Sequence, residues 1–187
     1  MQSISKHIIK QAAQGDMEAF EEIYRISSGF VYSIALRVTN NEADAEEVTQ
    51  DAFMKIYKNL KDFGFRSAFK TWAYRITVNT AINAKKKELR RRSQQVDYDI
   101  AVKTISAPKT ARSTFENEDN EKIISSMLAV LNPEQRACLV LREIEGLSYK
   151  EIAKVLGINI NTVCSRLKRA RETLFTLAKV EVIKDEL

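Results

Sequence analysis

Apolar residues recur every three or four positions along most of the chain, which is the spacing of one face of an α-helix. Between residues 20 and 60 this spacing predicts two long helices that break at Asn40 and Asn41. Asp16 precedes the first of them and is a suitable N-cap. A third helical run begins near Ala68 and ends in a series of lysines and arginines. The first part of the chain is therefore predicted to be a small helical bundle.

The same spacing predicts four shorter helices in the second part of the chain. Residues 123–131 carry the first apolar stripe, and Asn132, followed by Pro133 and Gln135, predicts a capped start for the next helix. Ser148 and Glu151 form a second capping-box sequence before a short helix that ends at Gly157. A final helix follows, with apolar residues at spacings of four and three.

Periodicity fails between the two helical parts, where Ser, Thr, Gln, Asp and Lys predominate and Pro108 occurs. We therefore predict an all-α protein with two small helical modules, residues 1–92 and 119–180. A flexible linker over residues 93–118 joins them, and residues 181–187 form a C-terminal tail.

The composition supports this prediction and excludes several classes of function. Five Gly and two Pro in 187 residues are too few for a turn-dense β-sandwich or barrel. The single histidine removes the usual general base and most zinc sites, so we expect no enzyme, metal or cofactor. The two cysteines lack a CxxC spacing and are expected to be ordinary thiols. No secretory signal or membrane-spanning run is present, which predicts a cytoplasmic protein that is not inserted in a membrane.

The formal net charge of +5 is concentrated in two tracts. One lies on the last helix, where Arg166, Lys168, Arg169 and Arg171 follow a short capped helix and a glycine-containing turn. This order is typical of a helix-turn-helix, whose second helix reads duplex DNA and uses arginine for both phosphates and guanine edges. The alternative is a solvated basic face on a bundle helix.

The second basic tract, residues 85–92, follows a segment rich in aromatic residues, residues 63–74. Aromatic rings beside a basic track suit single-stranded nucleic acid, because bases stack on rings while cations follow the phosphates. Trp72 also fits a core position on a helix. Phe65, Arg66 and Ser67 lie in the predicted loop and are better candidates for base contact.

A third charged feature is acidic and lies beside the apolar stripe of the second helix, at Asp44, Glu46, Glu47 and Asp51. Without a nearby histidine it does not indicate metal or acid–base chemistry. It is either a solvated helix face or a docking surface for a basic protein.

Several motifs along nearly the whole chain resemble the extracytoplasmic-function sigma factors, a two-module class of the sigma-70 family of bacterial RNA polymerase specificity subunits. Residues 43–53 (ADAEEVTQDAF) and 67–76 (SAFKTWAYRI) resemble sigma region 2. Residues 131–134 (LNPE), 147–153 (LSYKEIA) and 162–171 (TVCSRLKRAR) resemble region 4.

The resemblance implies three binding surfaces and no chemistry of the chain's own. It implies contact with the melted minus-10 strand by Phe63, Phe65, Arg66, Ser67, Lys70, Trp72, Arg75, Asn79, Asn83, Lys85 and Lys86. It implies reading of the minus-35 duplex by Thr162, Ser165, Arg166, Lys168, Arg169 and Arg171. It implies docking on core RNA polymerase by Asp44, Glu47, Val48, Gln50, Asp51 and Phe53. An anti-sigma factor is a further implied partner.

Cys164 departs from the family pattern, which commonly has Lys or Arg at this position, so we do not carry that DNA contact over. The second hypothesis is a stand-alone helix-turn-helix repressor whose first module senses a ligand or dimerises. The promoter sequence, the inducing signal and the identity of an anti-sigma factor do not follow from the sequence.

Overall fold

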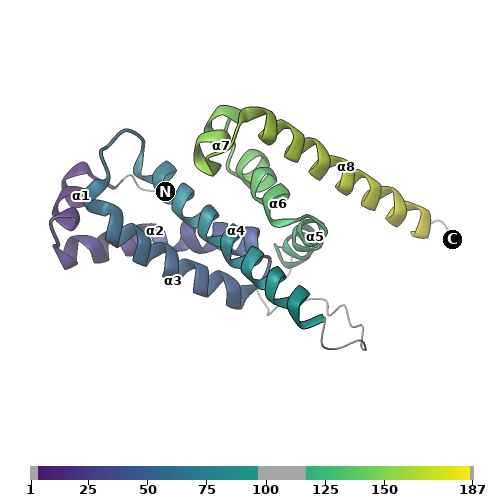
Figure 1. Cartoon of the computed structure of the whole chain (residues 1–187), viewed down its shortest axis with the longest axis horizontal. Coiled ribbons are helices and arrows are strands. Elements are labelled where there is room, and N and C mark those ends of the chain that lie inside the picture. The colour runs from purple at the N-terminus through teal and green to yellow at the C-terminus, as the bar shows by residue number, and fades with distance from the viewer. Residues whose placement is uncertain (1–3, 97–116, 186–187) are drawn as a thin grey trace.

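The computed structural model describes residues 4–96 and 117–185, with side chains within 4–92 and 123–177. These residues form helices and no strand (Figure 1), which confirms the predicted all-α class. The N-terminal module contains α1 (Lys6–Ala13), α2 (Met17–Thr39), α3 (Glu42–Asn59), the 3₁₀ turn η1 (Leu60–Asp62) and α4 (Phe69–Val96). The C-terminal module contains α5 (Asn117–Ala129), α6 (Pro133–Leu139), the π-helical turn η2 (Val140–Ile144), α7 (Tyr149–Leu156) and α8 (Ile160–Asp185).

Helix ends differ in three places from the boundaries expected from the sequence. Helix α4 runs through Val96 and α5 begins at Asn117, so helix enters both ends of the predicted linker. Helix α8 runs through Asp185, into the segment expected to be a tail. The remainder of the linker, residues 97–116, lies outside the described residues. Helix α1 is not among the helices expected above, although its apolar residues have helical spacing, and Ile9 and Ala12 are buried.

Side-chain caps fix the helix starts where the sequence predicts them. The Asp16 carboxylate accepts a hydrogen bond from the Ala19 amide at 3.0 Å. Asn132 and Ser148 each form a complete capping box, at the starts of α6 and α7. Gly157 ends α7 with φ 66°, a left-handed conformation that glycine adopts without strain. The predicted capped helix, tight turn and second helix are therefore present.

The first helix of the C-terminal module is less buried than its apolar stripe suggests. Leu128 and Leu131 are buried, but Ile123, Ile124 and Met127 are exposed. The apolar stripe predicted there is therefore only partly buried. An apolar stripe is buried only where a neighbouring element covers it, and the described residues cover one edge of α5.

The two modules pack against each other, although the sequence predicted separate modules on a tether. One cluster of buried residues contains Val78 and Ile82 of α4 together with Leu141, Ile152 and Val155 of the C-terminal module. Helices α6 and α7 both contact α4 (Figure 1). The apolar spacing could not predict this packing, because it identifies the buried face of a helix but not the element that packs against that face.

Within the described parts of the chain, no helix is both long enough and apolar enough to cross a bilayer.

We predict that Leu141→Ala lowers the free energy of unfolding by about 2–5 kcal/mol, because it leaves a cavity where the modules meet. Leu141 is fully buried in the shared cluster. Urea denaturation followed by circular dichroism measures the loss. Ile144→Ala, at a side chain that is 41% exposed, is the control and should change the stability by under about 0.5 kcal/mol. Equal losses in the two variants would contradict the assignment of Leu141 to the core.

Candidate nucleic-acid interface

A cluster of aromatic rings joins the loop after η1 to the start of α4. The Phe63 ring centroid lies 4.9 Å from those of Phe65 and Trp72 and 6.0 Å from that of Phe69. Phe63 and Phe69 are buried, whereas Phe65 and Trp72 are partly exposed. Phe65 has φ 52°, an uncommon conformation for an aromatic residue. The buried rings thus hold the loop in a shape that leaves Phe65 and Trp72 accessible.

Beside this cluster, α3 and α4 enclose a cleft of about 380 Å³. Lys55 and Asn59 line it from α3, and Trp72, Arg75 and Asn79 are among the residues that line it from α4. The Lys55 ammonium donates to the Thr80 hydroxyl at 3.0 Å, so its charge is held at the wall of the cleft. The cleft thus combines one ring, three amides and two cations with one carboxylate, that of Asp62. The ring, amides and cations match the chemistry of an unstacked base and its phosphate.

A second hollow, of about 570 Å³, continues along α4 and shares Asn83 with the cleft. Its other lining residues are Lys86, Lys87, Arg90 and Arg91. The cleft and this hollow form a track of positive charge along α4.

The structure separates the residues expected to contact the minus-10 strand into three groups. Arg66, Ser67, Lys70, Arg75, Asn83 and Lys86 are exposed, and Phe65, Trp72, Asn79 and Lys85 are partly buried. Phe63 is 7% exposed at the centre of the ring cluster, so its assignment to direct base contact is corrected to a supporting position.

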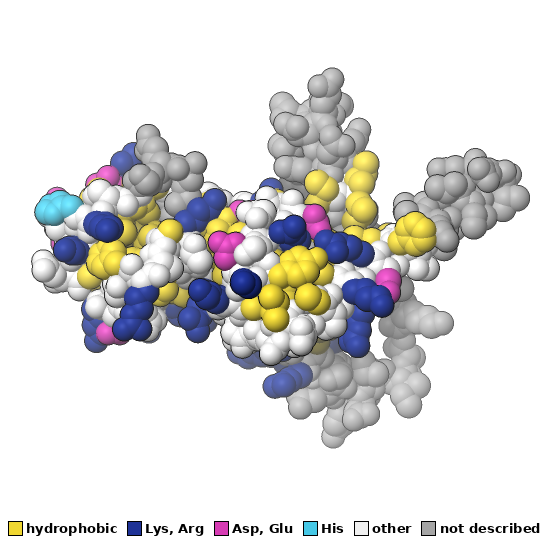
Figure 2. Space-filling model, turned by 90° about the horizontal axis from the view of Figure 1, so that it is seen from above, with side chains coloured by type: hydrophobic (Ala, Val, Ile, Leu, Met, Phe, Trp, Pro, Cys, Tyr) yellow, Lys and Arg dark blue, Asp and Glu magenta, His cyan; other side chains and the backbone are white. Residues whose placement is uncertain are grey.

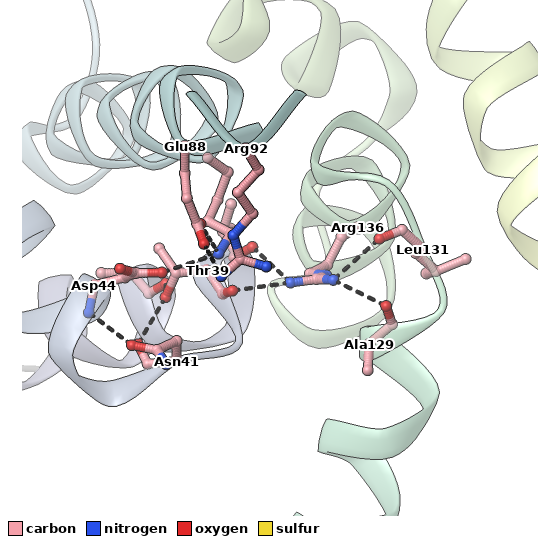
Figure 3. Close-up of polar contacts among 11 residues, drawn as sticks. Thr39, Asn41, Asp44, Glu88, Arg92, Ala129, Leu131 and Arg136 are labelled. Atoms are coloured by element: carbon pink, nitrogen blue, oxygen red, sulfur yellow. Dashed lines mark hydrogen bonds and ion pairs between the residues drawn. The ribbon is translucent and has the colours of Figure 1, made fainter. Parts of the chain in front are cut away.

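Lys85 is committed to carboxylates within its own module. Its ammonium lies 2.9 Å from Asp44 Oδ2 and also pairs with Glu88, which in turn contacts Arg92 at 2.5 Å (Figure 3). These contacts tie the start of α3 to α4. Lys85 therefore offers DNA less free charge than its place in the basic run suggests.

The helix-turn-helix is formed by α7, the turn at Gly157 and α8. Val163, Leu167 and Ala170 are buried along the inner face of α8. Ser165, Lys168 and Arg169 are exposed on the other side, and Cys164 is exposed beside them. Thr162 and Arg166 are partly buried. Lys and Arg side chains occur on both halves of the molecular face in Figure 2.

Three of the expected minus-35 contacts, Arg166, Lys168 and Arg171, have carboxylates nearby. Lys168 Nζ lies 3.8 Å from Glu172 Oε1, one turn further along α8. Arg171 Nη2 lies 2.7 Å from Glu143 Oε1, an ion pair in which both side chains are half exposed. Burial disfavours ionisation of Glu134, but the hydrogen bond from Lys86 and the charges of Lys86 and Arg166 lower its pKa overall. Arg166 thus faces a carboxylate of its own module.

Helix α3 presents an acidic outer face. Glu47, Gln50 and Asp51 are exposed, and Glu47 and Asp51 form no ion pair within the described residues. Val48 and Phe53 are 1% and 5% exposed, so their assignment to polymerase contact is corrected. They hold the inner face of α3, because a helix buries one side and exposes the other.

The structure adds residues that the sequence analysis did not select. Lys55, Asn59 and Asp62 line the cleft from α3 and η1, and Met54, 55% exposed, extends the acidic outer face of α3. Lys55 lies on α3, which packs against the basic helix α4, and its positive charge is the one signal in the sequence that could have suggested it. Among the described residues, no group of His, Cys, Asp and Glu side chains could hold a metal ion.

Comparisons with known proteins agree with this geometry. The family model for sigma-70 region 2 matches residues 23–92, and that for sigma-70 region 4 matches residues 121–174. The RNA polymerase sigma-H factor of Pseudomonas aeruginosa is 32% identical over 92% of this chain and 93% of its own length. The ECF RNA polymerase sigma factor SigW of Bacillus subtilis is 31% identical over 93% of this chain and 96% of its own length.

Two solved structures share the fold at 24% identity. One is CnrH in complex with the cytosolic domain of CnrY, with a TM-score of 0.64 over 95% of this chain and 99% of that chain. The other is the sigma factor RpoE of Bartonella quintana in complex with the anti-sigma factor NepR. Its TM-score is 0.61, over 86% of this chain and 97% of that chain.

Both sigma-70 regions occur in order, and the two relatives named above align over nearly all of their length. The chain therefore belongs to the ECF sigma factors of the sigma-70 family.

Proposed function

We propose that this sigma factor reads promoter DNA with two surfaces of different kinds. The N-terminal module, residues 1–92, holds the melted minus-10 strand, and the C-terminal module, residues 119–180, reads the minus-35 duplex. The observation that carries this proposal is that a ring-lined basic cleft and a helix-turn-helix with a basic outer face occur on one chain. The chain acts by binding and performs no chemistry of its own.

The cleft suits a single strand better than a duplex. The Trp72 ring lines it, and Arg75 and Asn79 line it with donors for a base or a phosphate. Phe65 belongs to the neighbouring ring cluster, through Phe63. A base in a duplex is stacked and paired, so only an unstacked base can use both kinds of contact. The basic hollow along α4 adjoins the cleft, and its lysines and arginines would contact the phosphates of the same strand.

The outer face of α8 suits a duplex. Ser165, Lys168 and Arg169 are exposed near the start of a helix whose inner face is buried, as a major-groove helix requires. Cys164 adds a neutral side chain to this surface. We infer that the minus-35 preference of this chain differs from that of relatives with a cation there.

We assign core RNA polymerase to the acidic outer face of α3, defined by Glu47, Gln50, Asp51 and Met54. This face combines carboxylates that form no ion pair within the described residues with an exposed apolar side chain, which suits a basic partner protein. An anti-sigma factor is the second protein partner that we infer, as in the complex of RpoE with NepR. We place the chain in the cytoplasm, where promoter DNA and RNA polymerase meet.

Reconstitution with core polymerase tests the function as a whole. Sequencing of transcript starts should reveal a set of promoters that depends on the added chain. A stand-alone repressor would instead bind specific duplex DNA tightly without polymerase in a gel shift. The family match does not favour that alternative.

For the cleft, we predict that Arg75→Ala weakens binding of the melted strand by roughly fivefold and lowers the salt slope by about 0.7, the value for one phosphate contact on a single strand. Fluorescence anisotropy of the polymerase complex with a single-stranded probe at several salt concentrations measures both. Arg25→Ala removes the same charge from an exposed position on α2 and is the control. Equal effects of the two substitutions would show that only net charge matters.

For the helix-turn-helix, we predict that Arg169→Ala reduces discrimination at one minus-35 base pair by about 1–3 kcal/mol. Competition between matched and singly mismatched duplexes measures this value. Uniform weakening across all sequences, with a salt slope lower by about 0.9, would contradict base reading and indicate a phosphate contact. Arg25→Ala again controls for net charge.

For the acidic face of α3, we predict that Asp51→Lys reduces capture by core polymerase at least about tenfold, since it places a cation against a basic partner. Minus-35 duplex binding by the free chain should not weaken. Analytical gel filtration with core polymerase measures capture, and Glu21→Lys on α2 is the charge-matched control. Loss of both activities would point to misfolding, and loss in both variants would remove the docking role from α3.

A further inference from the structure

A row of exposed side chains runs along the outer side of α8, opposite the buried side chains of Val163, Leu167 and Ala170. Its members recur at spacings of four, three and four, and they are Asn161, Ser165, Lys168 and Glu172. Helix α8 begins beside α7, at Ile160 (Figure 1), so Asn161 lies in its first turn. In a helix-turn-helix, the N-terminal residues of the second helix contact the base edges. The row therefore starts where base reading is expected.

Two of the three arginines of α8 are held by contacts within their own module. Arg171 Nη2 donates to Glu143 Oε1 at 2.7 Å. Arg166 is partly buried and lies against α6. Burial raises the pKa of the Cys138 thiol to about 11, and the charge of Arg166 and its hydrogen bond to the thiol oppose that rise. The guanidinium of Arg169 is exposed and has no hydrogen bond or ion pair within the described residues. It is therefore the guanidinium of this helix that is free to read a guanine.

The first two members of the row carry neutral groups with different hydrogen-bonding capacity. Asn159 caps the helix, because its side-chain oxygen accepts from the Asn161 backbone amide at 2.8 Å. The Asn161 side chain itself makes no hydrogen bond in the described parts of the chain. The Ser165 hydroxyl donates to the Thr162 carbonyl oxygen at 3.0 Å, so its oxygen can only accept from DNA. Asn161 thus presents a donor and an acceptor that are both free.

This pair of groups matches one base. Adenine presents the N7 acceptor and the N6 amino donor side by side in the major groove, and an asparagine amide pairs with both at once. Residues 160–165 carry no charged side chain, and Cys164 is exposed beside Asn161 and Ser165. The start of α8 therefore offers hydrogen bonds to bases, whereas Lys168 and Arg169 in the next turn offer charge.

We propose that Asn161 is a further specificity-determining residue of this chain, which reads an adenine of the minus-35 duplex through N6 and N7. The inference rests on the proposed function, because it requires α8 to lie in the major groove. Asn161 and Arg169 are separated by about 12 Å along the helix axis, at about 1.5 Å per residue. This is the length of roughly three to four base-pair steps of about 3.4 Å. The adenine therefore lies within about four base pairs of the base pair that Arg169 contacts.

Transcription from a promoter library with a randomised minus-35 region tests the proposal, using the full chain with core polymerase. A barcode in each transcript identifies its promoter, so sequencing gives the base preference at every position. Asn161→Ala should lower the preference for adenine at one pair by about tenfold, within the range for one bidentate contact, and leave the other pairs unchanged. The affected pair should differ from the one affected by Arg169→Ala. Thr176→Ala, which alters an exposed polar side chain further along α8, is the control and should change no preference.

Asn161→Arg gives a change that a merely structural role would not produce. Arginine pairs with guanine N7 and O6, so the preferred base at the same pair should change from adenine to guanine. A residue that acts only through the stability of α8 would change the activity of all promoters alike. The switch therefore separates base reading from helix stability.

Three results would overturn the proposal: unchanged preferences in Asn161→Ala, uniform weakening across all minus-35 sequences, or the same change in Thr176→Ala. Arg169→Ala distinguishes this failure from failure of the proposed function. If Arg169→Ala shifts the preference at one pair and Asn161→Ala shifts none, the proposed function stands and the role of Asn161 is wrong. If no promoter in the library depends on the added chain, the proposed function itself fails.

Discussion

The arrangement of the two modules depends on one buried guanidinium. Burial lowers the pKa of Arg136 to about 10, and the side chain remains protonated at neutral pH. A buried charge without a carboxylate partner is unfavourable unless every nearby acceptor is used, and here four carbonyl oxygens accept from it. Among the described residues, the Nε atom of Arg136 has no hydrogen-bond partner. Because the acceptors come from the C-terminal ends of α2 and α5, the guanidinium fixes where those ends lie relative to each other.

At the interface between the modules, apolar contacts bury most of the surface, and polar contacts fix the relative position of the modules. Val78, Leu141 and Ile152 belong to one buried cluster, and such packing is not directional. The contacts of Glu145 with Tyr74 and Arg37 are directional and lie along the same interface. Burial, followed by the hydrogen bond to Glu145, raises the pKa of Tyr74, so its hydroxyl remains a donor. Together these contacts select one arrangement from the many that apolar packing allows.

In the candidate DNA surface, some residues of the aromatic segment are buried and support the loop, and others are available to contact DNA. Phe63 and Phe69 are buried and hold the loop, while Phe65 and Trp72 reach its surface. Helix α3 divides in the same way, with Val48 and Phe53 inward and Glu47 and Asp51 outward. In both segments the residues that fold the protein and those available to a partner alternate within a few positions.

The sequence by itself determined the helices other than α1, the caps at Asp16, Asn132 and Ser148, and the helix-turn-helix, because each depends on residues within one or two turns. It also located the charged tracts and the aromatic segment, since these are local in composition. Only the tertiary structure decided that Phe63 is buried, that Lys55 joins the cleft and that Lys86 meets Glu134. It alone showed that Arg136 joins the modules. Helical periodicity predicts which face of a helix is buried but not which element covers it. The presence of a cation in the sequence likewise does not predict which acceptors it will contact in the fold.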